Sequence, residues 1–225
     1  MVLFKDRFDA GRKLAQKIAE LSPKHTKGFV VLGIPRGGIA VGYPVAKSLS
    51  CPLEPVSVRK LPIPWNDQVG FGAVTVNKEV ILNEELLSRE DVPEDDREHI
   101  INEVYKEVVR RDKLYRGDRP FPELKNTHVI IVDDGLATGY TMLAAIRFAR
   151  EKEAGLIIAA VPVAHHYSYH MVRPHVDDMV CLYIDEHLSF AVASFYREFP
   201  DMEDREVIEI LKKMAGYHTA LHRKG

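Results

Sequence analysis

Apolar residues follow two alternating patterns along the chain, short unbroken runs and positions three or four residues apart. The unbroken runs are typical of strands that are covered on both faces in a parallel sheet. They lie at 29–34, 129–132, 154–163 and 177–184, and a further strand is predicted at 54–60. Helices are predicted at 8–21, 39–49, 84–89, 93–115, 142–151 and 203–221. This order predicts an α/β fold with a five-stranded, mainly parallel sheet flanked by helices.

One segment between the second strand and the third departs from this alternation. Residues 61–67 contain Pro62 and Pro64 beside Trp65, the only tryptophan, and predict a proline-punctuated loop. Residues 70–82 predict a β-hairpin whose polar two-residue turn is Asn77-Lys78. The hairpin therefore follows directly on the loop, before the next helix begins.

Composition excludes some classes of protein. The 225 residues suffice for one domain with a sizeable core. A net charge of −2 gives no electrostatic case for general nucleic-acid binding. Apolar runs fall short of a membrane span, and early charges argue against a signal peptide. Cys51 and Cys181 lack metal-ligand spacing, so we expect a reduced, cytoplasmic setting.

Histidines gather in the segment 164–170, which predicts a loop after the fourth strand. His165, His166 and His170, with His175 nearby, suggest a zinc site. No cysteine or acidic residue lies among them to complete the usual ligand set. We therefore predict no metal bound by protein ligands alone.

The segment 129–141, reading Val-Ile-Ile-Val-Asp-Asp-Gly-Leu-Ala-Thr-Gly-Tyr-Thr, predicts a strand, a tight turn and a helix N-terminus. Its two glycines allow the backbone to approach a ligand closely. Backbone N–H groups at 136–141 and the hydroxyls of Thr138 and Thr141 are suited to an anion. The turn lacks the Gly-Lys-Ser/Thr ending of a Walker A loop.

Asp133 and Asp134 precede this turn, and the motif contains no cation to offset their repulsion. Ionised carboxylates only accept hydrogen bonds, so vicinal ribose hydroxyls could donate to both. The simpler interpretation is a buried strand with Asp134 capping a helix. That interpretation explains neither the second acid nor both threonines.

A second anion-binding loop is predicted where the first strand ends, at Pro35-Arg36-Gly37-Gly38. Arg36 could contact a phosphate, and the N–H groups of both glycines could point at it. Taken alone, this sequence is more typical of an ordinary strand-to-helix turn. Paired with the segment 129–141, the same sequence favours the anion loop.

The segment 129–141 resembles the 5-phosphoribosyl pyrophosphate (PRPP) binding motif of the type I phosphoribosyltransferases, position by position. Residues 4–12 and the aromatic tail 188–200 are similar to one largely uncharacterised group of that family. The resemblance implies that the acid pair binds ribose and that the following loop binds the 5-phosphate. It implies a pyrophosphate loop at 35–38, in which a cis Pro35–Arg36 peptide is usual. Arg59 and Lys60 resemble basic residues near pyrophosphate, or are solvated charges at a strand end.

The residues that this resemblance assigns to the site form two sets. The expected catalytic residues are Asp133, Asp134 and Arg36. The expected substrate-binding residues are Pro35, Gly37, Gly38, Arg59, Lys60, Gly135, Leu136, Ala137, Thr138, Gly139, Tyr140 and Thr141.

The implied reaction transfers the 5-phosphoribosyl group from PRPP to a small nitrogenous acceptor, with a nucleobase expected, and releases pyrophosphate. Mg²⁺ is expected to be held mainly through PRPP. We expect one domain at 1–225, with a core at about 25–185, a lid hairpin at about 60–83 and a hood at 186–225. Phe190, Phe195 and Tyr196 of the hood are candidates to stack on the acceptor. A homodimer is compatible with this function. The alternative is a non-catalytic PRPP or nucleotide sensor that binds nucleic acid.

Overall fold

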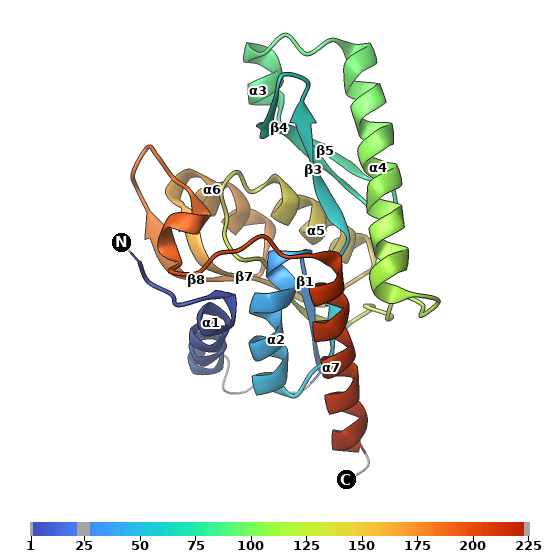
Figure 1. Ribbon diagram of the computed structural model, residues 1–225, viewed down its shortest axis with the longest axis vertical. Helices are drawn as coiled ribbons and strands as arrows, with labels where there is room; N and C mark the ends of the chain where they lie inside the picture. The colour runs from blue at the N-terminus through green and yellow to red at the C-terminus, as the bar shows by residue number, and fades with distance from the viewer. Residues whose placement is uncertain (1, 22–27, 223–225) are drawn as a thin grey trace.

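The computed structural model describes residues 2–21 and 28–222 of the chain. Five strands form one sheet in the order β2-β1-β6-β7-β8, and every neighbouring pair is parallel (Figure 1). The strands are β1 Phe29–Gly33, β2 Leu53–Pro55, β6 His128–Val132, β7 Leu156–His165 and β8 Asp178–Asp185. The predicted five-stranded parallel sheet is confirmed. Its strands read as unbroken apolar runs because helices cover both of its faces.

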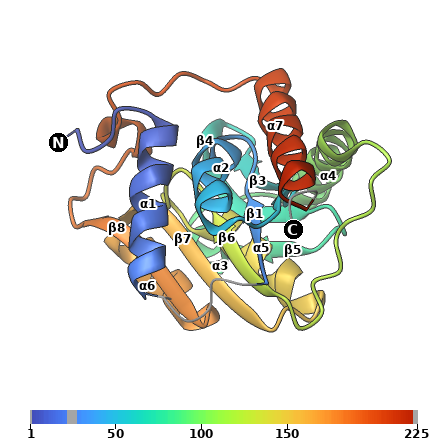
Figure 2. The same ribbon diagram turned by 90° about the horizontal axis from the view of Figure 1, so that it is seen from below.

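The two faces of the sheet are covered by different helices (Figure 2). One face packs against α1 Arg7–Leu21, α2 Gly37–Leu49 and α7 Asp204–His222. The other packs against α5 Tyr140–Glu151 and α6 His166–Val172. Alternation along β1 divides its side chains accordingly, with Val31 in the first core and Leu32 in the second. No helix in the described ranges is long and apolar enough to cross a membrane.

A second, antiparallel sheet stands on the main body (Figure 1). It consists of β3 Val58–Ile63, β4 Asn66–Thr75 and β5 Val80–Leu82, and it packs with α3 Glu84–Arg89 and α4 Glu94–Arg116. We call residues 58–116 the antiparallel unit. Its own core includes the buried side chains Leu61, Phe71 and Val108. The predicted hairpin with a turn at Asn77-Lys78 is confirmed, since β4 pairs with β5 around it.

Two sequence predictions in this region were wrong. The strand expected at 54–60 is two strands, β2 in the main sheet and β3 in the antiparallel one. The loop expected at 61–67 is largely the end of β3 and the start of β4. Pro62 is tolerated because β3 is an edge strand, where a missing N–H breaks no second ladder. Leu61 and Ile63 alternate with that proline and are buried.

The tail 186–203 contains a short 3₁₀ helix, Val192–Phe195, and pairs with the start of the chain. Leu3 and Phe4 donate backbone hydrogen bonds to Phe195 O, and Arg197 N–H donates to Phe4 O. Phe4 and Tyr196 also pack ring to ring, with centroids 5.3 Å apart. The pairing of the tail with the start of the chain places the first residues of α1 at the carboxyl edge of the main sheet. A further 3₁₀ turn, Arg173–His175, follows α6.

Candidate active site

Two loops meet at the carboxyl ends of the neighbouring strands β1 and β6. Gly33 is in register with Val132, and Ile34 N–H donates to Val132 O at 2.9 Å. A Cβ at Gly37 would lie 1.8 Å from Asp134 Oδ2, and one at Gly38 would lie 2.4 Å from Val132 O. Only glycine permits so close an approach. The loop at 35–38 and the acid pair therefore form a single continuous surface.

The loop at 35–38 connects β1 to α2. Its Pro35–Arg36 peptide is cis, as the family resemblance implies. Arg36 is half-buried and immediately precedes α2. The N–H of Gly38, however, donates to Ile34 O at 2.9 Å, so the prediction that it is free for an anion was wrong. The turn into α2 uses that donor to close its first bond.

The phosphate loop, residues 135–141, leads from β6 into α5. Gly139 has φ of 85°, a left-handed conformation that favours glycine. In the part of the chain that is described, the N–H groups of residues 137–141 have no backbone acceptor. Leu136 differs, because its N–H donates to Val163 O at 2.9 Å and its carbonyl accepts from His165 N–H. Leu136 therefore fixes the loop to β7, and the predicted anion contact from its N–H was wrong.

The segment 164–170, predicted as a loop, is the end of β7 followed by α6, which supports the phosphate loop. Ser168 Oγ donates to Ala137 O. A Cβ at Gly139 would lie 2.5 Å from Met171 Cε. The loop prediction failed because the apolar residues of this short helix pack against the core on one face of the main sheet. That contact joins residues distant in the chain, so the local sequence does not show it. Among the described residues, no three His, Cys, Asp or Glu side chains gather in a way that could hold a metal ion.

The two acids have different partners. Asp133 Oδ1 accepts the Asp134 N–H at 2.8 Å. Asp134 Oδ2 lies 2.7 Å from Arg7 Nε, and both side chains of this ion pair are mostly buried. The Arg7 guanidinium also donates to Pro200 O at 2.8 Å and lies 3.7 Å from the Phe199 ring centroid. The cation absent from the motif is thus supplied by the first residue of α1.

Burial dominates the electrostatics of this pair. It raises the pKa of Asp133 well above the ordinary range, and the neighbouring Asp134 charge raises that pKa further. Burial also raises the pKa of Asp134, whereas the Arg7 guanidinium opposes that shift. Arg7 therefore favours the ionised form of both carboxyls, since its charge lowers the pKa of each. Separately, Tyr196 donates its hydroxyl to Asp134 O at 2.6 Å and holds the backbone there.

The two predicted basic residues of β3 are separated by the strand's alternation. Arg59 lines a small cavity together with Pro35, and its Nη1 lies 3.3 Å from Glu107 Oε1 of α4. Lys60 is not among the residues that line this cavity, and a Cβ at Gly70 would meet its side chain. Burial lowers the pKa of both side chains. The fold thus places Arg59, but not Lys60, against the 35–38 loop.

Comparisons with known proteins agree with this geometry. Residues 4–194 match the family described as "Phosphoribosyl transferase domain". The chain belongs to the phosphoribosyl transferase family. It is 38% identical over 213 residues to the Mycobacterium tuberculosis protein named "Putative phosphoribosyl transferase Rv0571c", covering 95% of this chain and 47% of that protein. The chain therefore spans about half the length of the curated relatives it matches.

Solved structures support the same fold. The crystal structure of TT1426 from Thermus thermophilus is 32% identical, with a TM-score of 0.76, and the match covers 95% of this chain and 99% of that one. The AQ2163 protein from Aquifex aeolicus, at 12% identity and a TM-score of 0.52, shares the fold alone; that match covers 81% of this chain and 76% of that one. The five-stranded parallel sheet with a separate antiparallel sheet is thus the type I phosphoribosyl transferase fold.

Sequence analysis missed three residues that the fold places at this candidate site. Arg7 lies in the segment 4–12, which was noted for its similarity to one group of the family, without a role for this arginine. Ser168 lies among the histidines, where the imidazoles were the more visible feature. Arg111 lies on the heavily charged α4 and lines the same cavity as Arg59. In each case the signal was present, but the partner was far away in sequence.

Proposed function

We propose that this protein transfers the 5-phosphoribosyl group of PRPP to a nitrogen nucleophile and releases pyrophosphate. The observation that carries the proposal is the set of N–H groups at 137–141, directed at no backbone acceptor in the described structure and set directly after the acid pair. They lie at the N-terminus of α5, where an anion is stabilised. The hydroxyls of Thr138 and Thr141 add neutral donors. A 5-phosphate bound there would leave its ribose over Asp133.

In this proposal the two acids do different work. The Asp133 carboxylate accepts from the ribose hydroxyls, while Asp134 stays in its ion pair with Arg7. Phosphate and ribose held at two points fix the direction of C1, which raises the effective concentration of the reacting groups. Asp134 would then contribute mainly by its charge and by holding Asp133 in place through its N–H.

Charge develops at both ends of the breaking bond. The ribose becomes oxocarbenium-like, as in glycoside chemistry, and pyrophosphate leaves with negative charge. Arg36 and Arg59 lie on that side and stabilise the leaving group electrostatically. Mg²⁺ would be held mainly by PRPP oxygens and water, and it would neutralise part of the same charge.

The acceptor is proposed to be a planar nucleobase bound under the hood. The ring of Phe190 is half-buried and lies 5.6 Å, centroid to centroid, from the His165 ring at the end of β7. Phe195 is buried in the apolar cluster beneath it, and the hydroxyl of Tyr196 donates to Asp134 O. Of the three hood aromatics, Phe190 therefore has the exposed surface best suited to stack on a base.

The test is pyrophosphate release from PRPP with Mg²⁺ and a panel of free nucleobases. We expect release that depends on one base or a small group of bases, and loss of PRPP binding in Asp133→Asn. Carboxylates bind hydroxyl donors more strongly than neutral amides do. A protein that binds PRPP without releasing pyrophosphate for any base, and that retains nucleic acid at moderate salt, would instead be a sensor.

A further inference from the structure

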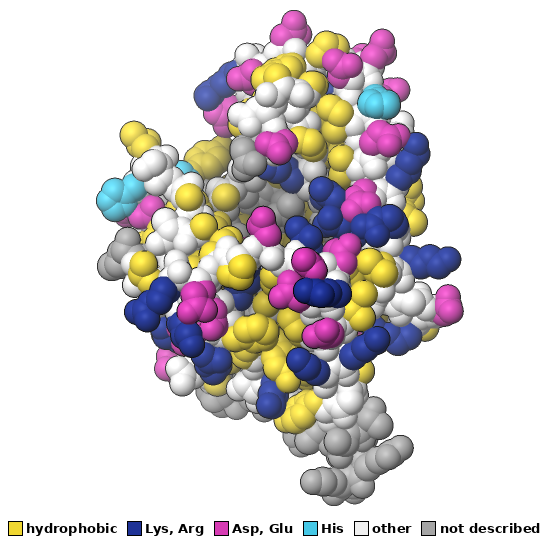
Figure 3. Space-filling view, viewed as in Figure 1, with side chains coloured by type: hydrophobic (Ala, Val, Ile, Leu, Met, Phe, Trp, Pro, Cys, Tyr) yellow, Lys and Arg dark blue, Asp and Glu magenta, His cyan; other side chains and the backbone are white. Residues whose placement is uncertain are grey.

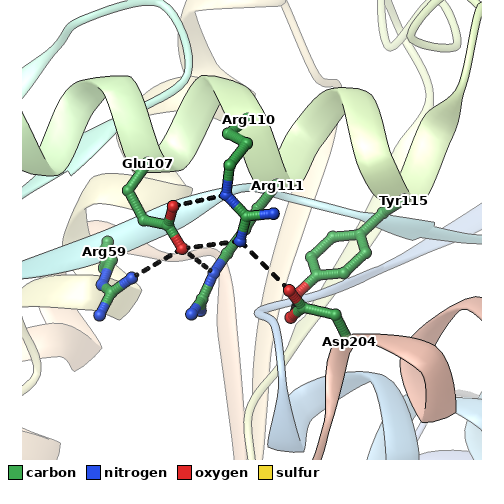
Figure 4. Close-up of polar contacts among 6 residues, drawn as sticks. All are labelled: Arg59, Glu107, Arg110, Arg111, Tyr115 and Asp204. Atoms are coloured by element: carbon green, nitrogen blue, oxygen red, sulfur yellow. Dashed lines mark hydrogen bonds and ion pairs between the residues drawn. The ribbon is translucent and has the colours of Figure 1, made fainter.

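Three arginines surround one carboxylate where the antiparallel unit meets the main body (Figure 4). Glu107 Oε1 accepts from Arg59 Nη1 at 3.3 Å and from Arg111 Nε at 2.7 Å. Arg110 makes a bidentate pair with the same carboxylate, at 2.6 Å to Oε2 and 2.9 Å to Oε1. Figure 3 shows Lys and Arg side chains gathered at this junction.

The cluster contains more positive than negative charge. The second acid, Asp204 of α7, is shared between Arg110, at 3.3 Å, and the hydroxyl of Tyr115, at 2.6 Å. Arg59 and Arg111 both donate to Glu107 Oε1, which also accepts from Arg110. Burial, the charge of Arg111 and the charge of Arg36 each lower the pKa of Arg59, so these guanidiniums lie close enough to repel one another. A multiply charged anion is the natural complement to such a set.

The location of the excess charge is specific. Arg59 and Arg111 line, with Pro35 and Tyr115, a cavity of about 10 Å³, so that only a thin gap separates α4 from the 35–38 loop. The Arg59 and Glu107 side chains are 43% and 29% exposed, so solutes can reach the cluster. An anion held by Arg36 would thus lie beside both guanidiniums.

Glu107 can give up two of its partners without becoming unpaired. Its bidentate bond to Arg110 uses both carboxylate oxygens. Hydrogen bonds from Arg110 and then Arg111 lower the pKa of Glu107 to about 2, so it remains an anion near neutral pH. The contact with Arg59, at 3.3 Å, is the longest that Glu107 makes with these arginines. An incoming phosphate group could therefore replace the carboxylate at Arg59 and Arg111 while Glu107 stays bonded to Arg110.

We propose that Arg111 of α4 is a pyrophosphate-binding residue, and that the Glu107 carboxylate occupies its binding position until the anion arrives. The proposal rests on the proposed function, because the anion is the pyrophosphate group of PRPP or the released product. It assigns to the antiparallel unit a direct contact with the leaving group. Arg110 is the anchor that holds Glu107 and does not touch the anion.

Inorganic pyrophosphate with Mg²⁺ is the probe, and calorimetry on the full chain measures its dissociation constant. Arg111→Met should weaken binding about tenfold, the usual effect of losing one charge-assisted hydrogen bond. The matched control is Lys106→Met, which removes an exposed positive charge from the same helix. It should change binding less than about twofold. Equal effects in the two variants would show a general charge effect and overturn the proposal.

Glu107→Gln separates binding from structural support. If the carboxylate competes with the anion, its removal should tighten pyrophosphate binding several-fold, and Arg111→Lys should recover part of the loss seen with methionine. If Glu107→Gln weakens binding as much as Arg111→Met does, the cluster only supports the fold and the proposal is wrong. A wild-type protein that binds neither PRPP nor pyrophosphate would defeat the proposed function itself. A wild-type protein that binds both, with Arg111→Met unchanged, defeats only the assignment of Arg111.

Discussion

Asp133 and Asp134 are neighbours in the chain but belong to different environments. Asp134 is paired with Arg7, 127 residues away, and is pressed against Gly37 so closely that no Cβ fits between them. Asp133 has only a backbone N–H as its hydrogen-bond donor among the described residues. One adjacent pair therefore supplies a mostly buried side chain held in an ion pair and a second side chain with no charged hydrogen-bond partner among the described residues.

Replacing Arg7 by methionine tests this division. Removal of one partner of a mostly buried ion pair should lower the free energy of unfolding by about 3 kcal/mol. It should also raise the pKa of both carboxyls, since Arg7 lowers both in the folded protein. PRPP affinity of the variant should therefore be lost mostly at acidic pH and recover partly as pH rises. Calorimetry from about pH 5 to about pH 8 measures this.

The sign for stability is opposite to that for binding. A carboxyl whose folded pKa lies above its unfolded value costs stability once pH rises past the unfolded value, here 3.8. Between the unfolded pKa and the raised pKa of the folded state, Arg7→Met should therefore lose more stability with rising pH than the wild type does. Arg12→Met, on the exposed side of the same helix, should show neither effect. Matching pH profiles in the two variants would contradict the proposed role of Arg7.

At the scale of elements, the antiparallel unit lies over the phosphate loop. Tyr167 of α6 donates to Glu85 of α3 at 3.0 Å, and a cavity of about 260 Å³ between them is lined partly by Thr138. The base of the β3–β4 hairpin is fixed by the buried side chains Leu61 and Phe71. A lid, if it closes over the ribose, must therefore move as the hairpin end or as the whole unit rather than as a free loop.

Trp65 is placed to report on such a movement. It lies between β3 and β4 with 56% of its surface exposed, and it is the only tryptophan of the chain. Addition of PRPP with Mg²⁺ should shift its fluorescence, because closure would exclude water from the ribose cation and from the indole. The signal should be absent in Trp65→Phe. Binding seen by calorimetry with unchanged fluorescence would show that this hairpin end is not the lid.

At the scale of the whole molecule, segments far apart in the chain close the acid site from one side. Residues 3–5 pair with residues 195–198, and this pairing brings both Arg7 and Tyr196 to Asp134. Opposite them, α4 joins the antiparallel unit to α7 through Asp204. The candidate site is thus held by the N-terminal segment, by the tail that leads into α7 and by α4, which are not neighbours in sequence.

Phe4→Ala tests the first of these connections. Phe4 is 3% exposed and packs on Tyr196, so its truncation should cost about 3 kcal/mol of stability. It should also weaken PRPP binding, since the Tyr196 hydroxyl supports the backbone of Asp134. Chemical denaturation and calorimetry measure the two effects. Val2→Ala, at a 56% exposed position, is the control and should be neutral. Loss of stability with unchanged PRPP affinity would separate the tail from the site.

The sequence determined the features that depend on neighbouring residues. Unbroken apolar runs identified β1, β6, β7 and β8, because strands covered on both faces have no polar side. The segment 129–141 predicted a strand, a turn and the start of a helix, and all three are present. Each of these patterns is contained in a window of a few residues.

Tertiary structure decided which groups remain available to a ligand. Leu136 offers an N–H in sequence, and it donates that N–H to Val163 O, a carbonyl that packing brings near. Residues 54–60 divide between two sheets because β2 pairs with β1, whereas β3 pairs with β4. Arg7 and Arg111 look like surface charges until the fold places them against Asp134 and the 35–38 loop. Pairing and burial depend on residues distant in the chain, so local patterns do not contain them.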